Sequence, residues 1–263
     1  MRSERFDFPG GAGHRLAARL DLPDEAPRAQ ALFAHCFTCG KDGHAASRLS
    51  AALAAEGVAT LRFDFTGLGG SDGDFSNTDF TSNVGDLVAA ANHLRAAGWP
   101  PAILIGHSLG GAAVLAAAAR IPEARAVATI GAPFEVAHVL DQFAAHVPEL
   151  EARGEAKVHL AGRPFTIRRD FVEDARSHDQ VPHIAALGRA LLVMHAPLDQ
   201  VVGIANARAI FDAAKHPKSF VALEGADHLL SRREDATYAA RVLAAWASRF
   251  VPADPAASAA PVG

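Results

Sequence analysis

Short apolar segments alternate with longer, alanine-rich amphipathic segments along most of this chain. The short segments have the length and composition of strands, and the longer ones have the periodicity of helices. The pattern predicts strands at Arg5–Phe8, Arg15–Leu20, Ala31–His35, Ala59–Phe63, Ala102–Gly106, Ala126–Gly131, Ala190–His195 and Ser219–Leu223, and helices over 45–56, 79–97, 110–120, 204–215 and 235–249. This alternation favours right-handed crossovers, and hence a mostly parallel eight-stranded sheet with helices on both faces.

Glycine and proline mark several of the predicted element ends. Gly57 and Gly98 follow predicted helices, at positions where a residue with positive φ is expected to end the helix. The first two strands are joined by the short, turn-rich segment Pro9–Gly13. A connection this short predicts an antiparallel hairpin, which departs from the parallel arrangement of the other strands.

One interval, between the predicted strands 126–131 and 190–195, is too long for a single crossover helix. Within it, 157–160 and 164–167 alternate polar and apolar residues around Ala161 and Gly162, which predicts a small hairpin. Helical segments near 135–146 and 169–176 flank the hairpin. We therefore expect a cap insertion at about 134–188 within one domain spanning 1–250. The Pro/Ala-rich segment 251–263 is expected to be a linker or a disordered end.

The amino-acid composition excludes several classes of protein. The chain has 263 residues, of which 50% are hydrophobic and 21% charged, with a net charge of −4. High apolar content and low net charge exclude general disorder, and the lack of basic excess argues against nucleic-acid binding. A charged start (MRSERFDF) and the absence of a long apolar run argue against a secretory signal and a membrane span. Two cysteines do not form a disulfide framework, and the expected location is cytoplasmic.

The strongest chemical signal is Gly106-His107-Ser108-Leu109-Gly110. It directly follows a predicted strand and opens an alanine-rich helix, which is the context of a nucleophile elbow. A serine hydroxyl is a poor nucleophile at neutral pH and needs a general base that is itself oriented by an acid. The sequence therefore predicts Ser108 as a nucleophile, the alternative being a glycine-rich turn with an incidental serine.

An acid and a histidine follow Ser108 at the ends of later strands. Asp199 comes just after the strand 190–195, and His228 comes just after the strand 219–223. Because the carboxyl ends of neighbouring parallel strands meet at one edge of a sheet, both side chains are expected to reach Ser108. Asp199 has a helix N-cap as its alternative role, and His228 a place on a surface loop. Glu135 and Asp227 are rival acids.

With these motifs, the chain resembles the α/β-hydrolase superfamily over nearly its whole length. GHSLGG is similar to its nucleophile motif, FDFTGLGGSDG to its D-x-x-G-x-G-x-S segment, and GADHLL to its catalytic-histidine loop. The segments AHCFTCGKD, RFDFTGLGGSDGDF and GHSLGGAAVL also resemble the hydrolase half of bacterial fusion proteins that carry an OsmC-like peroxidase domain. The fold implied is the α/β-hydrolase fold, and the tail would then be the linker or its remnant.

The resemblance also implies an oxyanion hole built from main-chain N–H groups. One donor is the residue after the nucleophile, Leu109. The other comes from the loop after the third strand, where His35-Cys36-Phe37 matches a His-Gly-x pattern and makes Phe37 the second donor. Cys36 replaces the usual glycine, which puts the conformation of this loop in question.

The two cysteines allow other chemistry. Cys36 and Cys39 form a C-x-x-C motif, so they are a candidate redox pair. With His35 and His44 they are also a candidate zinc site, although the oxyanion loop already uses part of this segment. The glycines at 67, 69 and 70 do not fit G-x-G-x-x-G, which argues against a dinucleotide site.

We therefore expect a serine hydrolase that cleaves carboxylic esters through an acyl-enzyme on Ser108, without metal or organic cofactor. The alternatives are an acyltransferase with the same residues and a non-catalytic binding module. Apolar residues of the cap suit an acyl chain or a small aromatic ester, although they equally suit a core of the cap itself: Phe134, Val139, Leu140, Phe143, Phe165 and Phe171. The sequence does not indicate the oligomeric state.

Overall fold

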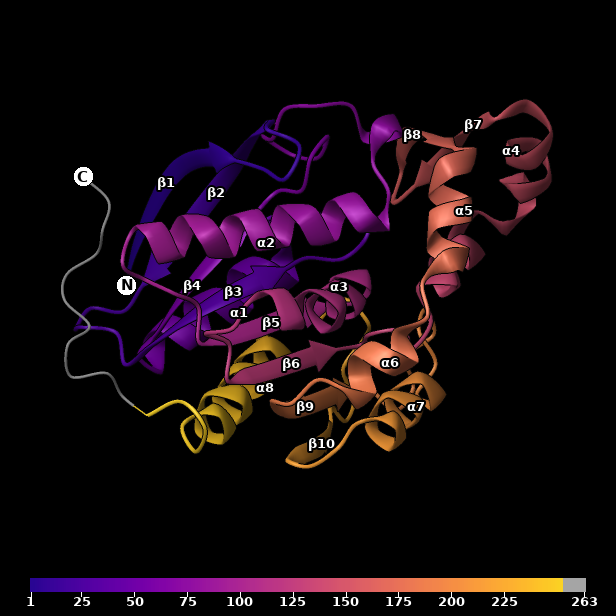
Figure 1. Cartoon of the computed structure of the whole chain (residues 1–263). Coiled ribbons are helices and arrows are strands. Elements are labelled where there is room, and N and C mark those ends of the chain that lie inside the picture. Colours follow the sequence, from indigo (N-terminus) through magenta and orange to yellow (C-terminus); the bar gives the residue numbers. More distant parts are fainter. Residues whose placement is uncertain (253–263) are drawn as a thin grey trace.

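A central sheet of eight strands organises the computed structural model of this chain, which describes residues 1–252 (Figure 1). The strand order is β1-β2-β4-β3-β5-β6-β9-β10. The first strand pairs antiparallel with the second, the second antiparallel with β4, and all the remaining pairs are parallel. The strands are β1 (Arg2–Pro9), β2 (Arg15–Leu22), β3 (Ala29–Ala34), β4 (Val58–Phe63), β5 (Ile103–His107), β6 (Ala126–Ile130), β9 (Ala190–His195) and β10 (Lys218–Ala222).

The predicted strands and the hairpin at the start of the chain are confirmed, with ends shifted by a few residues. Every residue of the parallel strands β4, β5, β6 and β9 is buried. This explains why those segments are largely apolar, because helices cover a parallel sheet on both faces. In β1, by contrast, burial is largely confined to one side, as expected for an edge strand.

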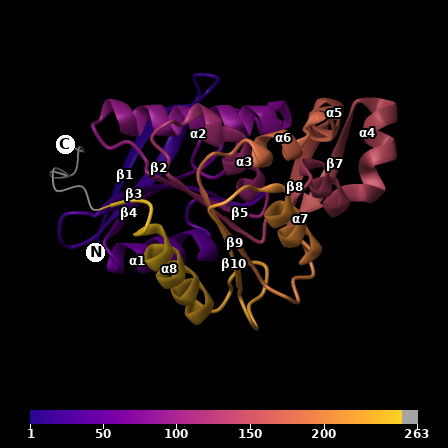
Figure 2. The same ribbon diagram turned by 60° about the horizontal axis from the view of Figure 1, so that its bottom comes forward.

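Helices cover the two faces of the sheet (Figure 2). On one face, α1 (His44–Ala55) packs against α8 (Arg233–Ala247), and on the other α2 (Phe80–Ala96) packs against α3 (Leu109–Ala117). The remaining elements here are α7 (Ala205–Ala213) and the 3₁₀ turns η1 (Phe75–Asn77) and η2 (Ala118–Arg120). Gly57 and Gly98 have φ of 79°, as expected for residues that end helices. Each helix layer closes its own apolar core against the sheet.

The connection from β6 to β9 forms a separate group of elements at the end of the molecule away from the two termini (Figure 1). It comprises η3 (Val136–His146), α4 (Val147–Arg153), β7 (Glu155–Leu160), β8 (Arg163–Arg168), α5 (Arg169–Ser177) and α6 (Gln180–Ala185). We call residues 131–189 the insertion. Strands β7 and β8 form the predicted hairpin, turning at Ala161 and Gly162, which both have positive φ.

The helix expected over 135–146 is instead a run of 3₁₀ turns with a break at Phe143. Phe143 leaves helical dihedral angles (φ −141°, ψ 31°) and is buried, its ring 6.2 Å from that of Phe171. A new helix then begins at Val147, with Pro148 in its first turn, where proline is tolerated. Burial of the Phe143 ring thus accompanies the break in the helix.

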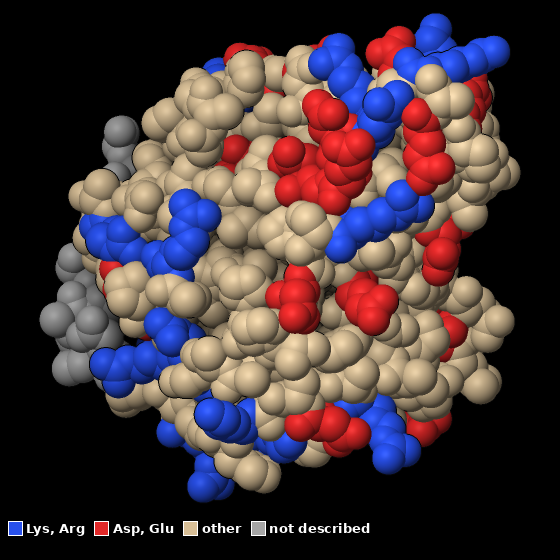
Figure 3. All heavy atoms as spheres, turned by 45° about the vertical axis from the view of Figure 1, so that its right-hand side comes forward, with Lys and Arg blue, Asp and Glu red and all other residues tan. Residues whose placement is uncertain are grey.

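The surface on the side of the insertion carries both signs of charge, with wide uncharged areas between the charged groups (Figure 3). No helix within residues 1–252 combines the length and the apolar composition needed to cross a bilayer. The Pro/Ala-rich segment expected over 251–263 lies outside the described residues from position 253 onward.

Candidate active site

Ser108 lies in a sharp turn between β5 and α3. Its backbone has φ 54° and ψ −126°, a conformation that residues other than glycine rarely adopt. The chain passes itself closely here, because a Cβ at Gly106 would lie 2.2 Å from the Gly110 carbonyl oxygen. The Ser108 N–H donates to the Ile130 carbonyl at the end of β6, at 2.8 Å. The structure thus has the predicted strand–turn–helix elbow, with the serine at its apex.

Asp199 and His228 meet at the carboxyl edge of the sheet, as their positions after β9 and β10 predict. The His228 Nδ1–H donates to Asp199 Oδ2 at 2.7 Å, and both side chains are buried. The other oxygen of Asp199 accepts the backbone N–H groups of Val201 and Val202 at 2.8 and 2.9 Å. These contacts orient the imidazole with Nδ1 toward Asp199, so that Nε2 is the ring nitrogen that this pair does not use.

Burial raises the pKa of Asp199, but the hydrogen bonds from His228 and from the backbone N–H groups lower it by more. The net pKa of Asp199 lies below its usual value, so the carboxylate is charged at neutral pH. Neither rival acid occupies this place: Glu135 is exposed, and Asp227 accepts the backbone N–H of Ser231 at 2.8 Å.

Gly131 brings the Ser108 turn beside the Asp199–His228 pair. It follows Ile130, which accepts the Ser108 N–H, and it has φ 56°. A Cβ at Gly131 would lie 3.3 Å from His228 Nδ1 and 3.4 Å from Asp199 Oδ2, so this backbone packs directly against both side chains. The packing of Gly131 against these side chains was not predicted. Its position after a buried parallel strand nevertheless places it at the carboxyl edge of the sheet, where Asp199 and His228 lie.

His107, the neighbour of Ser108, holds the backbone of His228. Its Nε2–H donates to the His228 carbonyl at 2.7 Å, and the two rings lie 5.1 Å apart. Burial, and secondarily the charge of His228, lower the pKa of His107 to about 4, so this side chain is neutral at pH 7. Sequence reasoning missed this contact, because a residue adjacent to the nucleophile gives no sign of which loop it reaches.

A second buried histidine, His195, supports the loop that carries Asp199. Its Nε2–H donates to the Val202 carbonyl at 2.7 Å, and Nε2 lies 3.8 Å from Asp199 Oδ2. Burial lowers its pKa. Neutral His195 therefore braces the loop without competing with His228 for the Asp199 carboxylate.

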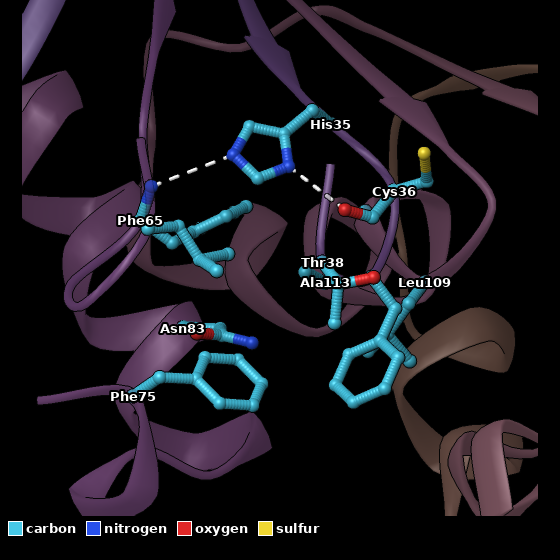
Figure 4. Close-up of a pocket in the computed structure, with 11 residues that line it drawn as sticks. His35, Cys36, Thr38, Phe65, Phe75, Asn83, Leu109 and Ala113 are labelled. Atoms are coloured by element: carbon cyan, nitrogen blue, oxygen red, sulfur yellow. Dashed lines mark hydrogen bonds between the residues drawn. The ribbon is translucent and has the colours of Figure 1, made fainter. Parts of the chain in front are cut away.

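The loop after β3 forms a tight turn over residues 36–39, which we call the oxyanion loop. The Cys39 N–H donates to the Cys36 carbonyl at 3.1 Å, and His35 Nδ1–H donates to the same carbonyl at 2.8 Å (Figure 4). Phe37 and Thr38 are the two corner residues, whose N–H groups the turn itself does not use. Leu109 is the first residue of α3, so its N–H has no acceptor within the helix.

Cys36 and Cys39 form a disulfide across the oxyanion loop, with Cα atoms 5.2 Å apart. The sequence marked them as a candidate redox pair but did not show whether they are bonded to each other. With its sulfur atoms joined, the pair does not offer the thiolates that the alternative zinc site requires. Within residues 1–252 no group of three or more His, Cys, Asp or Glu side chains is placed to hold a metal ion.

Aromatic side chains of the insertion pack onto the oxyanion loop. The ring of Phe37 lies 5.3 Å from that of Phe171 and 5.8 Å from that of Phe75, which in turn lies 4.9 Å from Phe165. A cavity of about 10 Å³ remains between this cluster and α3, and Leu109 and Ala113 line it (Figure 4). The insertion thus packs onto the oxyanion loop, and little free space remains on the side of this loop that faces α2 and Leu109.

Comparison with known proteins agrees with this geometry. Residues 31–252 match the Alpha/beta hydrolase family. The chain belongs to this family. A solved structure, the esterase domain of a Rhodothermus marinus protein, is 49% identical and superposes with a TM-score of 0.76 over 95% of this chain and 100% of that one. The hydrolase is therefore similar in sequence as well as in fold to an esterase domain.

Two more distant relatives also match. The monoacylglycerol lipase of Mycolicibacterium smegmatis is 29% identical over 248 residues, covering 80% of this chain and 84% of the lipase. The mitochondrial palmitoyl-protein thioesterase ABHD10 of Rattus norvegicus is 27% identical over 189 residues, covering 68% of this chain and 62% of that protein. This hydrolase accordingly has esterase and lipase homologues.

Proposed function

We propose that this protein is a serine hydrolase that cleaves carboxylic esters, with Ser108, His228 and Asp199 as its catalytic triad. The observation that carries the proposal is the 2.7 Å contact between His228 Nδ1 and Asp199 Oδ2 beside the strained serine turn. A buried carboxylate that fixes a histidine tautomer beside the sharp turn that carries a serine is an arrangement that can activate a serine hydroxyl.

The reaction follows from these positions. His228 Nε2 takes the proton of the Ser108 hydroxyl as its oxygen attacks the ester carbonyl, and Asp199 stabilises the resulting imidazolium. The imidazolium then protonates the departing alcohol, which leaves an acyl-enzyme. Water, activated by His228 in the same way, hydrolyses this acyl-enzyme and restores Ser108.

The N–H groups of Phe37 and Leu109 are the proposed oxyanion hole. Both lie at positions where the local structure does not use the hydrogen: Phe37 at a turn corner, and Leu109 at the start of a helix. The helix dipole of α3 adds positive potential at this end. Removing one such donor costs about 10²–10³ in rate in serine hydrolases where this has been measured.

We propose esters with small acyl groups as the favoured substrates. The names of two relatives, a monoacylglycerol lipase and a palmitoyl-protein thioesterase, both refer to acyl groups. In this chain, however, the space on the side of the oxyanion loop that faces Leu109 and α2 is only about 10 Å³, less than a long chain needs. A series of p-nitrophenyl esters should give the highest kcat/KM for acetate, and a steady rise with chain length would overturn this assignment.

The activity itself is tested by labelling with a fluorophosphonate. The wild type should be labelled at Ser108, and a folded Ser108→Ala variant should not. Failure of the folded wild type to react would support the alternative of a non-catalytic binding module. Acyl transfer is tested by adding an alcohol acceptor: a new ester that replaces the free acid as the main product would show a transferase.

A further inference from the structure

A second cavity, of about 350 Å³, lies on the other side of the oxyanion loop. The small cavity beside α3 faces α2, whereas this one faces α1 and the loop before α8. Its lining includes Cys36, Cys39, His44, Arg163, Leu229 and Ser231. Cys36 is buried, with 7% of its surface exposed, whereas Cys39 is half-buried. Figure 4 shows the Cys36 sulfur on the side of its residue away from Phe75 and Asn83. The disulfide therefore forms part of the wall of a cavity large enough for a small molecule.

The disulfide also closes a turn whose backbone conformation is unfavourable for one of its corner residues. Thr38, at the second corner, has φ 57°, in the left-handed region that β-branched residues avoid. This conformation is typical of glycine or asparagine at that position of a turn. Three hydrogen bonds help to hold the loop: the Cys39 N–H and His35 Nδ1–H donate to the Cys36 carbonyl, and Arg163 of the insertion donates to the Thr38 carbonyl. The covalent bond between the first and fourth residues is the fourth restraint.

We propose that the Cys36–Cys39 disulfide is a thiol–disulfide exchange site for a small thiol that enters the cavity, and that its reduction loosens the oxyanion loop. The exchange chemistry stands on the cavity and the cysteine pair alone. Its effect on hydrolysis rests on the proposed function, because only then does Phe37, between the two cysteines, donate to an oxyanion.

The exchange takes place in two steps. The thiolate of the small thiol attacks the Sγ of Cys39, the less buried of the two residues, so that a mixed disulfide forms and the Cys36–Cys39 bond breaks. Its electron pair leaves on Cys36 Sγ, which takes up a proton. A second thiol attacks the sulfur of the bound thiol, releasing the oxidised dimer of the small molecule and the Cys39 thiol. Two thiols are oxidised for each protein disulfide reduced. The guanidinium of Arg163 in the cavity wall favours the anionic attacking group.

Reduction removes the covalent one of four restraints on a disfavoured turn, so Thr38 can return to extended backbone and carry the Phe37 N–H away from the oxyanion. Full loss of one donor costs about 10²–10³ in rate. Because three hydrogen bonds still hold the loop, we expect a smaller fall in kcat of about tenfold, within that limit.

Mass spectrometry with glutathione as the probe tests the exchange without reference to activity. Native protein incubated with reduced glutathione should expose two alkylatable thiols. In the Cys36→Ser variant, oxidised glutathione should add one glutathione to Cys39. If native protein stays resistant to glutathione but yields two thiols after unfolding, the bond is inaccessible and the proposal is wrong. Free thiols in protein purified under oxidising conditions would overturn it equally.

Hydrolysis of p-nitrophenyl acetate tests the consequence. Wild type reduced with a phosphine, and then freed of it, should have a kcat about tenfold lower, and oxidised glutathione should restore it. A Cys36→Ser, Cys39→Ser double variant should have the rate of the reduced protein and should not respond to either reagent. Unchanged kcat on verified reduction would overturn the link to the oxyanion loop. No hydrolysis by any form, with exchange still seen by mass, would instead count against the proposed function.

Discussion

The Nε2–H of His107 donates to the backbone carbonyl of His228 at 2.7 Å. This bond joins the residue before the nucleophile to the residue proposed as its general base, across 121 positions of sequence. Ser108 is held from its other side by its own N–H, which donates to Ile130. The spacing between serine and histidine is thus set through the backbone, by groups that do not take part in the proposed reaction.

Replacing His107 by phenylalanine should lower kcat about tenfold, because the carbonyl of His228 loses its donor and the imidazole loses its fixed position. The His107→Gln variant, which keeps an N–H donor, should retain most of the activity. The measurement is kcat for p-nitrophenyl acetate, with circular dichroism to verify the fold. Equal rates in both variants would show that the bond does not position His228.

His107 also predicts how stability depends on pH. Burial holds its pKa at about 4, against an ordinary value of 6.5. Between these two values the unfolded chain binds a proton at this position and the folded chain does not. The contribution of His107 to the free energy of unfolding is therefore fully present above pH 6.5. It falls as the pH decreases toward 4, by up to about 3 kcal/mol.

Urea denaturation of the wild type and of His107→Gln at pH 7 and pH 4.5 would measure this effect. The difference between the two proteins cancels most contributions of other groups. The wild type should lose more stability than the variant on acidification, and parallel losses would contradict the assignment.

Asp199→Asn should lower kcat by about 10⁴, because an amide at this place favours the wrong tautomer of His228. Glu135→Gln is the matched control, since Glu135 is exposed and should matter little. Both are measured with the same ester. A large loss in the control, with activity kept in Asp199→Asn, would reassign the acid of the triad.

Substitution by alanine should lower stability at two glycines, Gly106 and Gly98, for different reasons. At Gly106 a Cβ would lie 2.2 Å from a backbone oxygen, so the elbow must distort and stability should fall by more than about 3 kcal/mol. At Gly98 nothing lies within 4 Å, and only its φ of 79° is unfavourable. Gly98→Ala should therefore cost only about 1–2 kcal/mol. Thermal or urea denaturation distinguishes the two, and equal losses would contradict this explanation.

Much of the fold could be predicted because parallel strands and their helices have strong local signals. β5 and β6 are largely apolar, and the elbow between β5 and α3 has glycines at the required spacing. The positions of Asp199 and His228 followed from the rule that parallel strands end at one edge. Their contact at 2.7 Å agrees with that expectation.

The remainder depends on contacts between distant segments. The break at Phe143 accompanies packing of its ring against Phe171 of α5, a contact that local periodicity does not contain. The roles of His107, His195 and Gly131 likewise depend on what each meets in space. The likeness to fusion proteins with an OsmC-like domain and the expected cytoplasmic location stay predictions.

The insertion enters the chain between β6 and β9, whereas the proposed nucleophile, acid and base follow β5, β9 and β10. The segments that carry the proposed nucleophile, acid and base are therefore separate from the segment that packs onto the oxyanion loop. An exchange of residues 134–188 for the corresponding segment of a related hydrolase would change this covering segment, whereas Gly131 and the strand ends that carry Ser108, Asp199 and His228 would stay in place. The architecture thus allows selection among substrates to evolve at a different pace from catalysis.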